Sequence, residues 1–177
     1  MKKIVLMGNP NVGKSIVFSR LTGAQVITSN FPGTTVDYSQ GTTCFQKERV
    51  FIIDAPGTYS LKPTNPAEEV ALRILKEADL IVNVIDATNL ERNLILTLEL
   101  LAWKKPLIIA LNMWDEAHHT GIEIDVEHLK ELLGVQIIPT VAVTGEGIAT
   151  LAEYCFSPVS IPDSGGWNEE EKWVMIG

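Results

Sequence analysis

The sequence contains little that is typical of secreted, membrane-spanning or nucleic-acid-binding proteins. Only two of its 177 residues are cysteines, Cys44 and Cys155, and no CxxC or Cys/His spacing surrounds them, which argues against a zinc site or a disulfide framework. We expect both thiols to be buried. No apolar run approaches the ~20 residues of a membrane helix, so we expect these residues to be soluble by themselves. Because 22 acidic residues outnumber 14 basic ones, no nucleic-acid partner is expected.

The composition suits one globular domain, with 46% hydrophobic and 20% charged residues. Short apolar runs rich in β-branched residues alternate with helical patterns, which predicts an α/β fold with helices on both faces of a mainly parallel sheet. We expect six strands, at 3–7, 38–45, 50–53, 80–85, 107–111 and 136–138. The second and third are close enough in sequence to form an antiparallel hairpin, which gives the sheet one antiparallel edge strand.

Helices are predicted at 14–21, 66–76, 89–103, 125–133 and 147–156. We expect one domain over residues 1–156. Residues 157–166 resemble a linker in composition, and 167–177 resemble the start of a helix that is cut off in mid-pattern. We therefore expect the natural chain to continue into a further helical region.

A complete GxxxxGK[ST] pattern follows the first predicted strand and opens the first predicted helix. The amides of such a loop can wrap a polyphosphate, and glycine is required where a side chain would block close approach. The helix N-terminus adds partial positive charge, Lys14 supplies a full charge for the β- and γ-phosphates, and the Ser15 hydroxyl is a ligand for Mg²⁺. The predicted nucleotide-binding residues here are Gly8, Asn9, Pro10, Asn11, Val12, Gly13, Lys14, Ser15 and Ile16.

A DxxG pattern, Asp54 to Gly57, ends a strand one hairpin later. Asp54 can hold a Mg²⁺-bound water, and the Gly57 amide can reach a γ-phosphate. The stretch between the two motifs carries hydroxyls that can close over the metal when a γ-phosphate is present. We expect three of its residues to contact the nucleotide, with one threonine as a Mg²⁺ ligand: Gly33, Thr34 and Thr35.

An NxxD pattern, Asn112 to Asp115, ends a buried strand. Guanine presents two adjacent N–H donors that the Asp115 carboxylate can accept, whereas adenine lacks that pair, so the motif predicts selection of guanine. Asn112 would brace the loop and reach the base. The alternative is that Asp115 is only a helix N-cap. Met113 keeps an apolar stem to lie on the base but carries no charge, which predicts weaker nucleotide retention.

The last candidate segment of the base pocket is Val141-Ala142-Val143. The Ala142 amide can face the guanine oxygen. The usual GTPase pattern here is Ser-Ala-x, in which the serine hydroxyl supports the loop. Val141 stands in the place of that serine, so this segment departs from the pattern.

The loop Asn9-Pro10-Asn11-Val12-Gly13-Lys14-Ser15 resembles that of the Era, TrmE, Der and FeoB group of GTPases. The run Asp54-Ala55-Pro56-Gly57-Thr58-Tyr59-Ser60-Leu61, with Asn112-Met113-x-Asp115, is similar to FeoB in particular, over about residues 1–155. The resemblance implies a Ras-like, three-layer P-loop GTPase fold that binds GTP or GDP with Mg²⁺ and hydrolyses GTP. It also implies helical and transmembrane portions of the same protein as partners, at the cytoplasmic face of the inner membrane, where GTP and GDP states would gate or drive ferrous iron uptake.

The resemblance also assigns catalytic roles. It makes Thr35, just before Val36 and Asp37, the Mg²⁺ ligand, and it makes Asn11 a ligand for K⁺, which would place positive charge beside the phosphates. The alternative is that Asn11 only shapes the turn. Thr58 occupies the position where many GTPases carry glutamine, and no arginine finger is evident, so we expect slow turnover. The predicted catalytic residues are Asn11, Lys14, Thr35 and Gly57.

Two alternatives remain open at this point. A ribosome-assembly or RNA-modification GTPase of the Era, TrmE or Der type fits the phosphate loop, but it would be expected to carry Asn-Lys-x-Asp and a basic RNA-facing module. A nucleotide-dependent interaction module with negligible turnover is the other. A second copy of the chain is a further candidate partner.

Overall fold

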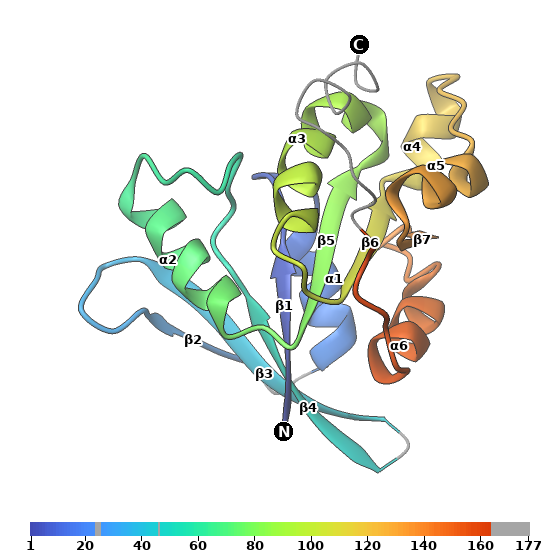
Figure 1. The fold of residues 1–177 in the computed structure, drawn as a ribbon. Coiled ribbons are helices and arrows are strands. Elements are labelled where there is room, and N and C mark those ends of the chain that lie inside the picture. The colour runs from blue at the N-terminus through green and yellow to red at the C-terminus, as the bar shows by residue number, and fades with distance from the viewer. Residues whose placement is uncertain (24–25, 46, 164–177) are drawn as a thin grey trace.

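The computed structural model describes residues 1–23, 26–45 and 47–163. Within these residues a single sheet lies at the centre of the molecule (Figure 1). Its strands are β1 (Lys2–Met7), β2 (Val26–Asn30), β3 (Asp37–Phe45), β4 (Glu48–Asp54), β5 (Leu80–Asp86), β6 (Leu107–Asn112) and β7 (Gln136–Pro139). They lie in the order β2-β3-β4-β1-β5-β6-β7. The five from β4 to β7 in this order run parallel, whereas β3 is antiparallel to both β4 and β2.

The predicted α/β architecture is confirmed, but the edge of the sheet was predicted wrongly. The described sheet has seven strands rather than six, because β2 pairs with the outer side of β3. The edge strand is therefore β2, and β3 is an internal strand. Three of the five β2 residues are polar, and four of the five are exposed. Because β2 buries no face, it has no apolar pattern from which it could be predicted.

Helices cover both faces of the sheet, as predicted. They are α1 (Lys14–Thr22), α2 (Pro66–Lys76), α3 (Leu90–Leu101), α4 (Trp114–His119), α5 (Val126–Leu133) and α6 (Ile148–Phe156), with a 3₁₀ turn, η1 (Ala87–Asn89), before α3. Helix α4 was not predicted, because its six residues are too few to show a helical period.

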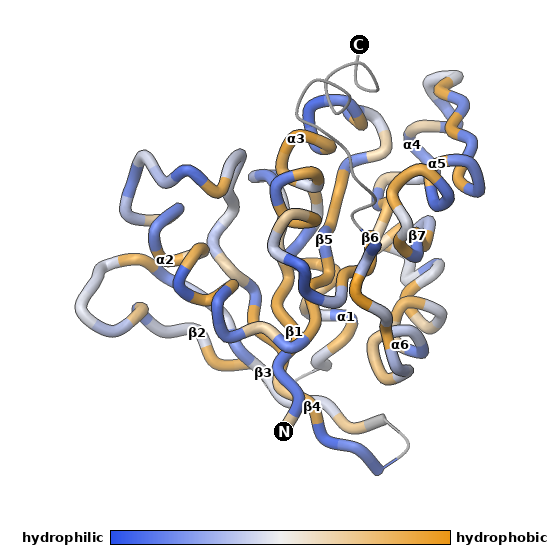
Figure 2. The backbone as a smooth tube through the Cα atoms, in the orientation of Figure 1, coloured by the Kyte–Doolittle hydropathy of each residue, from blue (hydrophilic) through white to orange (hydrophobic). Residues whose placement is uncertain are grey.

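Two apolar clusters fill the space between the sheet and its helices. One packs α2, α3, α4 and α5 against one face, with Val5 and Met7 of β1. The other packs α1 and α6 against the opposite face, with Ile4 and Leu6 of the same strand. Successive β1 residues thus enter opposite clusters, as the period of two in a strand requires. All residues of β6 are buried, and β5 is hydrophobic along much of its length in Figure 2, as expected for strands covered on both sides.

The two cysteines differ in exposure. Cys155 of α6 is buried, as predicted, but Cys44 of β3 is exposed, so that prediction is wrong. Cys44 pairs with Arg49 next to the turn that joins β3 to β4.

Residues 157–163 follow α6 without forming a helix or strand. The rest of the predicted linker and the helical start predicted from Trp167 lie outside the described residues, so the division of the chain at residue 156 stays a prediction. Among the described helices, none combines the length and the apolar character needed to cross a bilayer.

Candidate nucleotide site

The phosphate loop connects the end of β1 to the start of α1 and lies at the carboxyl ends of the parallel strands. Asn11 and Gly13 adopt left-handed backbone conformations, with φ of 64° and 84°. A Cβ on Gly8 would lie 2.5 Å from the Val84 carbonyl oxygen of β5, and a Cβ on Gly13 would lie 2.3 Å from Asn112 Nδ2. Both glycines are therefore required by packing against neighbouring segments as well as by the phosphate approach that the sequence suggested.

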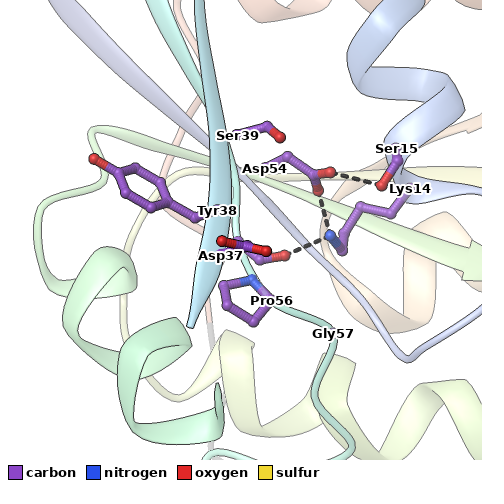
Figure 3. Close-up of a pocket in the computed structure, with 9 residues that line it drawn as sticks. Lys14, Ser15, Asp37, Tyr38, Ser39, Asp54, Pro56 and Gly57 are labelled. Atoms are coloured by element: carbon purple, nitrogen blue, oxygen red, sulfur yellow. Dashed lines mark hydrogen bonds and ion pairs between the residues drawn. The ribbon is translucent and has the colours of Figure 1, made fainter. Parts of the chain in front are cut away.

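Lys14 and Ser15, at the start of α1, point toward Asp54 at the end of β4 (Figure 3). The Lys14 ammonium donates to Asp54 Oδ1 and to the Ala55 carbonyl oxygen. The Ser15 hydroxyl donates to Asp54 Oδ2 at 2.7 Å. The side chains of Lys14 and Asp54 are only 9% and 8% exposed. A buried cation, a hydroxyl and a carboxylate therefore meet at the N-terminus of a helix, which is the arrangement that a bound phosphate and a divalent cation require.

A pocket of about 240 Å³ opens over this group. Besides Lys14, Ser15 and Asp54 it is lined by Asp37, Tyr38, Ser39, Ala55, Pro56 and Gly57. Oxygen donors from hydroxyls and carboxylates suit Mg²⁺, so the donor set fits this cation. The described residues contain no group of three or more His, Cys, Asp or Glu side chains that could hold a metal. A Mg²⁺ ion here would therefore complete its coordination with water and nucleotide oxygens.

Five pocket residues were not predicted, of which Ala55 and Pro56 lie inside the DxxG motif. Asp37, Tyr38 and Ser39 begin β3 and reach the pocket because β3 pairs with β4, opposite Asp54. The antiparallel hairpin was predicted, but no motif marks these side chains. Their proximity follows from register alone, since Ser39 pairs directly with Asp54.

The segment that carries Thr34 and Thr35 forms a turn between β2 and β3. The Phe31 amide donates to the Val36 carbonyl at 2.8 Å, and the Thr34 hydroxyl donates to the Phe31 carbonyl at 2.9 Å. Thr35 is exposed and does not line the pocket, nor does Gly33. The structure thus brings Ser15 and Asp54 together but leaves the third predicted metal ligand outside.

Gly57 lies against the phosphate loop. A Cβ at this position would meet Pro10 atoms at 3.1 Å, and the next amide, that of Thr58, donates to the Gly8 carbonyl at 3.0 Å. Thr58 is buried, and its hydroxyl donates to the Ser60 carbonyl at 2.7 Å. The side chain at the usual glutamine position therefore bonds within its own loop and also lies beside the Glu68 carboxylate of α2.

Asn112, at the end of β6, is buried and joins two other loops. Its Nδ2 donates to the Val12 carbonyl at 3.0 Å, and its Oδ1 accepts from the Ala142 amide at 3.0 Å. Asp115 is exposed in the first turn of α4, whose N-cap is Met113 in a left-handed conformation with φ of 58°. Asp115 is thus not the N-cap of this helix, but as an acidic residue in the first turn it still suits the helix N-terminus.

Residues 141–145, which we call the base loop, follow β7 and lie beside the end of β6. The Trp114 amide donates to the Thr140 carbonyl at 3.2 Å, which ties the two strand ends together. Val141 and Ala142 are buried, whereas Val143 is 64% exposed. The segments predicted to contact the base therefore lie near one another and next to the phosphate loop, although they are far apart in sequence.

Comparison with known proteins assigns this arrangement to a family. The family model described as "Ferrous iron transport protein B" matches residues 2–155. The chain belongs to the FeoB family. Curated relatives include the Fe(2+) transporter FeoB of Salmonella typhimurium, 43% identical over 159 residues, and an Fe(2+) transport protein A/FeoB fusion protein of Porphyromonas gingivalis, 42% identical over 158 residues. These alignments cover 85% and 88% of this chain but only 21% and 19% of the relatives, so the chain spans about a fifth of their length.

Solved FeoB structures share the fold. The cytosolic domain of L. pneumophila FeoB is 37% identical with a TM-score of 0.86, over 98% of this chain and 71% of that one. The G domain of T. maritima FeoB is 40% identical with a TM-score of 0.80, over 86% of this chain and 95% of that one. A mutant S. thermophilus NFeoB bound to GDP is 41% identical with a TM-score of 0.81, over 86% and 61%. The fold is thus that of the FeoB G domain, a P-loop GTPase, and the family is FeoB rather than Era, TrmE or Der.

Proposed function

We propose that this FeoB-family domain binds and hydrolyses GTP and acts as the regulatory domain of a membrane ferrous iron transporter. Alternation between GTP and GDP states would gate or drive iron uptake. The observation that carries the proposal is the meeting of Lys14, Ser15 and Asp54 at the N-terminus of α1, in a chain that matches the FeoB family along most of its length. A GDP-bound relative of the same fold supports the choice of nucleotide.

In this proposal the phosphate loop, residues 8–15, holds the nucleotide tail with its amides, and Ile16 follows it in α1. Lys14 exchanges its contact with Asp54 for the β- and γ-phosphates. Ser15 and Asp54 are the residues that would hold Mg²⁺, and the cation would compensate the charge of the phosphates. The nucleotide therefore replaces protein contacts that already satisfy the same groups.

The base would lie between the end of β6 and the base loop. Asp115 accepts its two N–H groups, Asn112 keeps the surrounding loops in place, and Met113 lies on the ring. The remaining contacts come from Val141, Ala142 and Val143. In this structure the Ala142 amide donates to Asn112 Oδ1, so Ala142 reaches the guanine oxygen only by sharing or exchanging that partner.

Switching would depend on the segment before β3 and on the DxxG loop. Thr35 lies outside the pocket, so it must move to become a Mg²⁺ ligand, together with Gly33 and Thr34. The Gly57 amide completes the contact to the γ-phosphate. GTP favours the closed arrangement only because these contacts need the γ-phosphate, and hydrolysis releases both segments.

Turnover of the isolated domain would be slow. No glutamine follows the DxxG motif, and Thr58 is buried with its hydroxyl bonded to Ser60. Asn11 is exposed in the phosphate loop and is the candidate ligand for K⁺, which would place positive charge beside the β- and γ-phosphates. The left-handed backbone of Asn11 also suits a residue that only shapes the turn.

The wider assignments belong to the whole protein. We propose that residues 1–156 form the GTPase domain, that residues 157–177 lead into a helical region, and that transmembrane portions of the same protein are its partners. The domain would then lie at the cytoplasmic face of the inner membrane, where it could also contact a second copy. The net charge of −8 does not favour a nucleic-acid partner.

Calorimetry on nucleotide-stripped protein tests nucleotide choice. We expect heat from GDP and GTP but not ATP, and loss of binding in Lys14→Ala; Arg73→Ala, which removes an exposed arginine on α2, is the matched control. Binding of ATP without GDP or GTP would overturn the proposal.

Phosphate release then tests hydrolysis and the role of potassium. We expect faster release in K⁺ than in Na⁺, and loss of that difference in Asn11→Ala. Equal rates in the two salts would remove the potassium role while leaving GTP hydrolysis in place. No release in either salt would leave a nucleotide-binding module.

A further inference from the structure

Arg20, in the last turn of α1, donates two hydrogen bonds to the base loop. Its Nε donates to the Ala142 carbonyl at 3.0 Å, and its Nη2 donates to the Val143 carbonyl at 2.5 Å. The guanidinium also lies under Gly145, where a Cβ would be 3.7 Å from Nη1. One side chain thus holds two successive carbonyls with the fork geometry that is specific to arginine.

These contacts fix the orientation of the peptide groups that the base would meet. The Ala142 amide is held by Asn112 Oδ1, and the Ala142 carbonyl is held by Arg20 Nε. In a trans peptide the N–H of Val143 points away from the carbonyl of Ala142, so the position of Arg20 also sets the direction of that N–H. The backbone N–H groups of Ala142 and Val143 are therefore each held in one orientation.

The loop has few other polar side chains to support it. Val141 is buried and supplies no hydroxyl, and Met113 supplies no charge from the neighbouring motif. The contacts within the loop are local, such as those from the Thr144 and Gly145 amides to the Val141 carbonyl at 3.1 and 2.9 Å. Only Asn112 and Arg20 tie the loop to other segments through the side-chain hydrogen bonds of the described residues.

We propose that Arg20 is a positioning residue for guanine: it holds the base loop in its binding conformation and thereby slows release of GDP. Arg20 lies six residues after Lys14, about 9 Å along the same helix. Helix α1 therefore supports both ends of the nucleotide site, with Lys14 and Ser15 at its first turn and Arg20 at its last. Within the described residues, both hydrogen bonds of the guanidinium go to the base loop and none goes to the phosphate loop or to Asp54.

This inference rests on the proposed binding of guanine nucleotide, and its test separates the two. Dissociation of a ribose-labelled fluorescent GDP is followed by stopped flow in the native protein, Arg20→Ala, Arg20→Lys and the control Arg73→Ala. A charged hydrogen bond at a part-exposed site contributes about one decade to an equilibrium constant. We therefore expect about tenfold faster release in Arg20→Ala, a smaller increase in Arg20→Lys, which lacks the fork, and the native rate in the control.

A second measurement distinguishes positioning from a general loss of structure. In Arg20→Ala the GTP concentration needed for half-maximal hydrolysis should rise by more than the maximal rate falls, because the guanine contact is weakened whereas Lys14, Ser15 and Asp54 are untouched. Native release of GDP from Arg20→Ala would overturn the inference while leaving the proposed function intact. An equal fall in hydrolysis and in GDP retention would also overturn it. Failure of the native protein to bind labelled GDP would instead overturn the proposed function, and this inference with it.

Discussion

The side chain of Asn112 donates to the main-chain carbonyl of Val12 at 3.0 Å, across 100 residues of sequence. The same side chain accepts from the Thr140 hydroxyl at 3.1 Å and from the Ala142 amide at 3.0 Å. Gly13 packs so closely against Asn112 that no other residue would fit there. One buried amide therefore joins the loops that follow β1, β6 and β7, so the phosphate and base ends of the site share a support.

The first prediction concerns this support. Replacing Asn112 with alanine leaves a buried carbonyl, amide and hydroxyl without their partner, and each such group costs about 1–3 kcal/mol. We expect Asn112→Ala to lower the free energy of unfolding of the nucleotide-free protein by at least about 3 kcal/mol, measured in urea. Asn112→Asp keeps the acceptor but loses the donor to Val12. Its free energy of unfolding should therefore lie between those of the native protein and Asn112→Ala. A change in Asn112→Ala below ~0.5 kcal/mol, the range of ordinary surface substitutions, would contradict the prediction.

The second prediction is a pH dependence from Glu68 of α2. Hydrogen bonds from the Thr64 amide and hydroxyl, both at 2.8 Å, hold the pKa of this carboxyl below its usual value of 4.5. A lowered folded-state pKa means that the ionised carboxylate stabilises the fold above pH 4.5 and that this contribution is lost as the pH falls through the folded pKa. We expect Glu68→Gln to be less stable than the native protein at pH 7, with a difference that shrinks below pH 4.5.

Glu69→Gln is the matched control for this experiment, because the neighbouring carboxylate is exposed. Its urea midpoint should stay close to native across the same pH range. A stability difference between Glu68→Gln and the native protein that stays constant from pH 7 to pH 3 would argue against the assigned role of the Thr64 contacts.

The third prediction concerns the segment after the DxxG motif. Glu99 of α3 accepts from the Ser60 hydroxyl at 3.0 and 3.1 Å and from the Leu61 amide. One side of α3 thus holds this segment in place. We expect Glu99→Ala to speed amide hydrogen exchange at Leu61 by about tenfold, because one charged hydrogen bond to that amide is lost. Glu91→Ala, an exposed acidic residue on the same helix, is the control. Equal exchange at Leu61 in the two variants would show that Glu99 does not restrain the segment.

The fourth prediction separates the two thiols. Burial raises the pKa of Cys155 to about 12, whereas Cys44 is exposed on β3. Because the thiolate is the reactive form, iodoacetamide at pH 8 should modify Cys44 in the native protein and Cys155 only after unfolding. Peptide mass spectrometry of protein labelled with and without urea locates the modification. Labelling of Cys155 at the same rate as Cys44 under native conditions would contradict the burial of α6 against the sheet.

Much of the site could be predicted from sequence because phosphate chemistry demands particular residues at fixed local spacing. A loop that wraps a polyphosphate needs glycines, a lysine and a hydroxyl next to a helix start, and residues 8–15 supply them in one run. The meeting of Asp54 with Ser15 was also within reach, because parallel strands bring their carboxyl ends to the same edge of a sheet. Strands β5 and β6 were predictable for a related reason: strands covered on both faces are largely apolar.

Other features depend on long-range packing that leaves no local pattern. Strand β2 is exposed and partly polar, and only its pairing with β3 makes it a strand. The turn that places Thr35 outside the pocket is set by the same pairing. Arg20 meets Val143 across 123 residues, and Glu99 meets Ser60 across 39; each is an ordinary polar residue on an exposed or half-exposed helix face until the fold brings its partner near. The sequence by itself determined which chemical groups are present and the elements that carry them, because composition and periodicity are local properties. The tertiary structure alone decided which loops those groups hold, because the partners of a side chain are set by strand order and register.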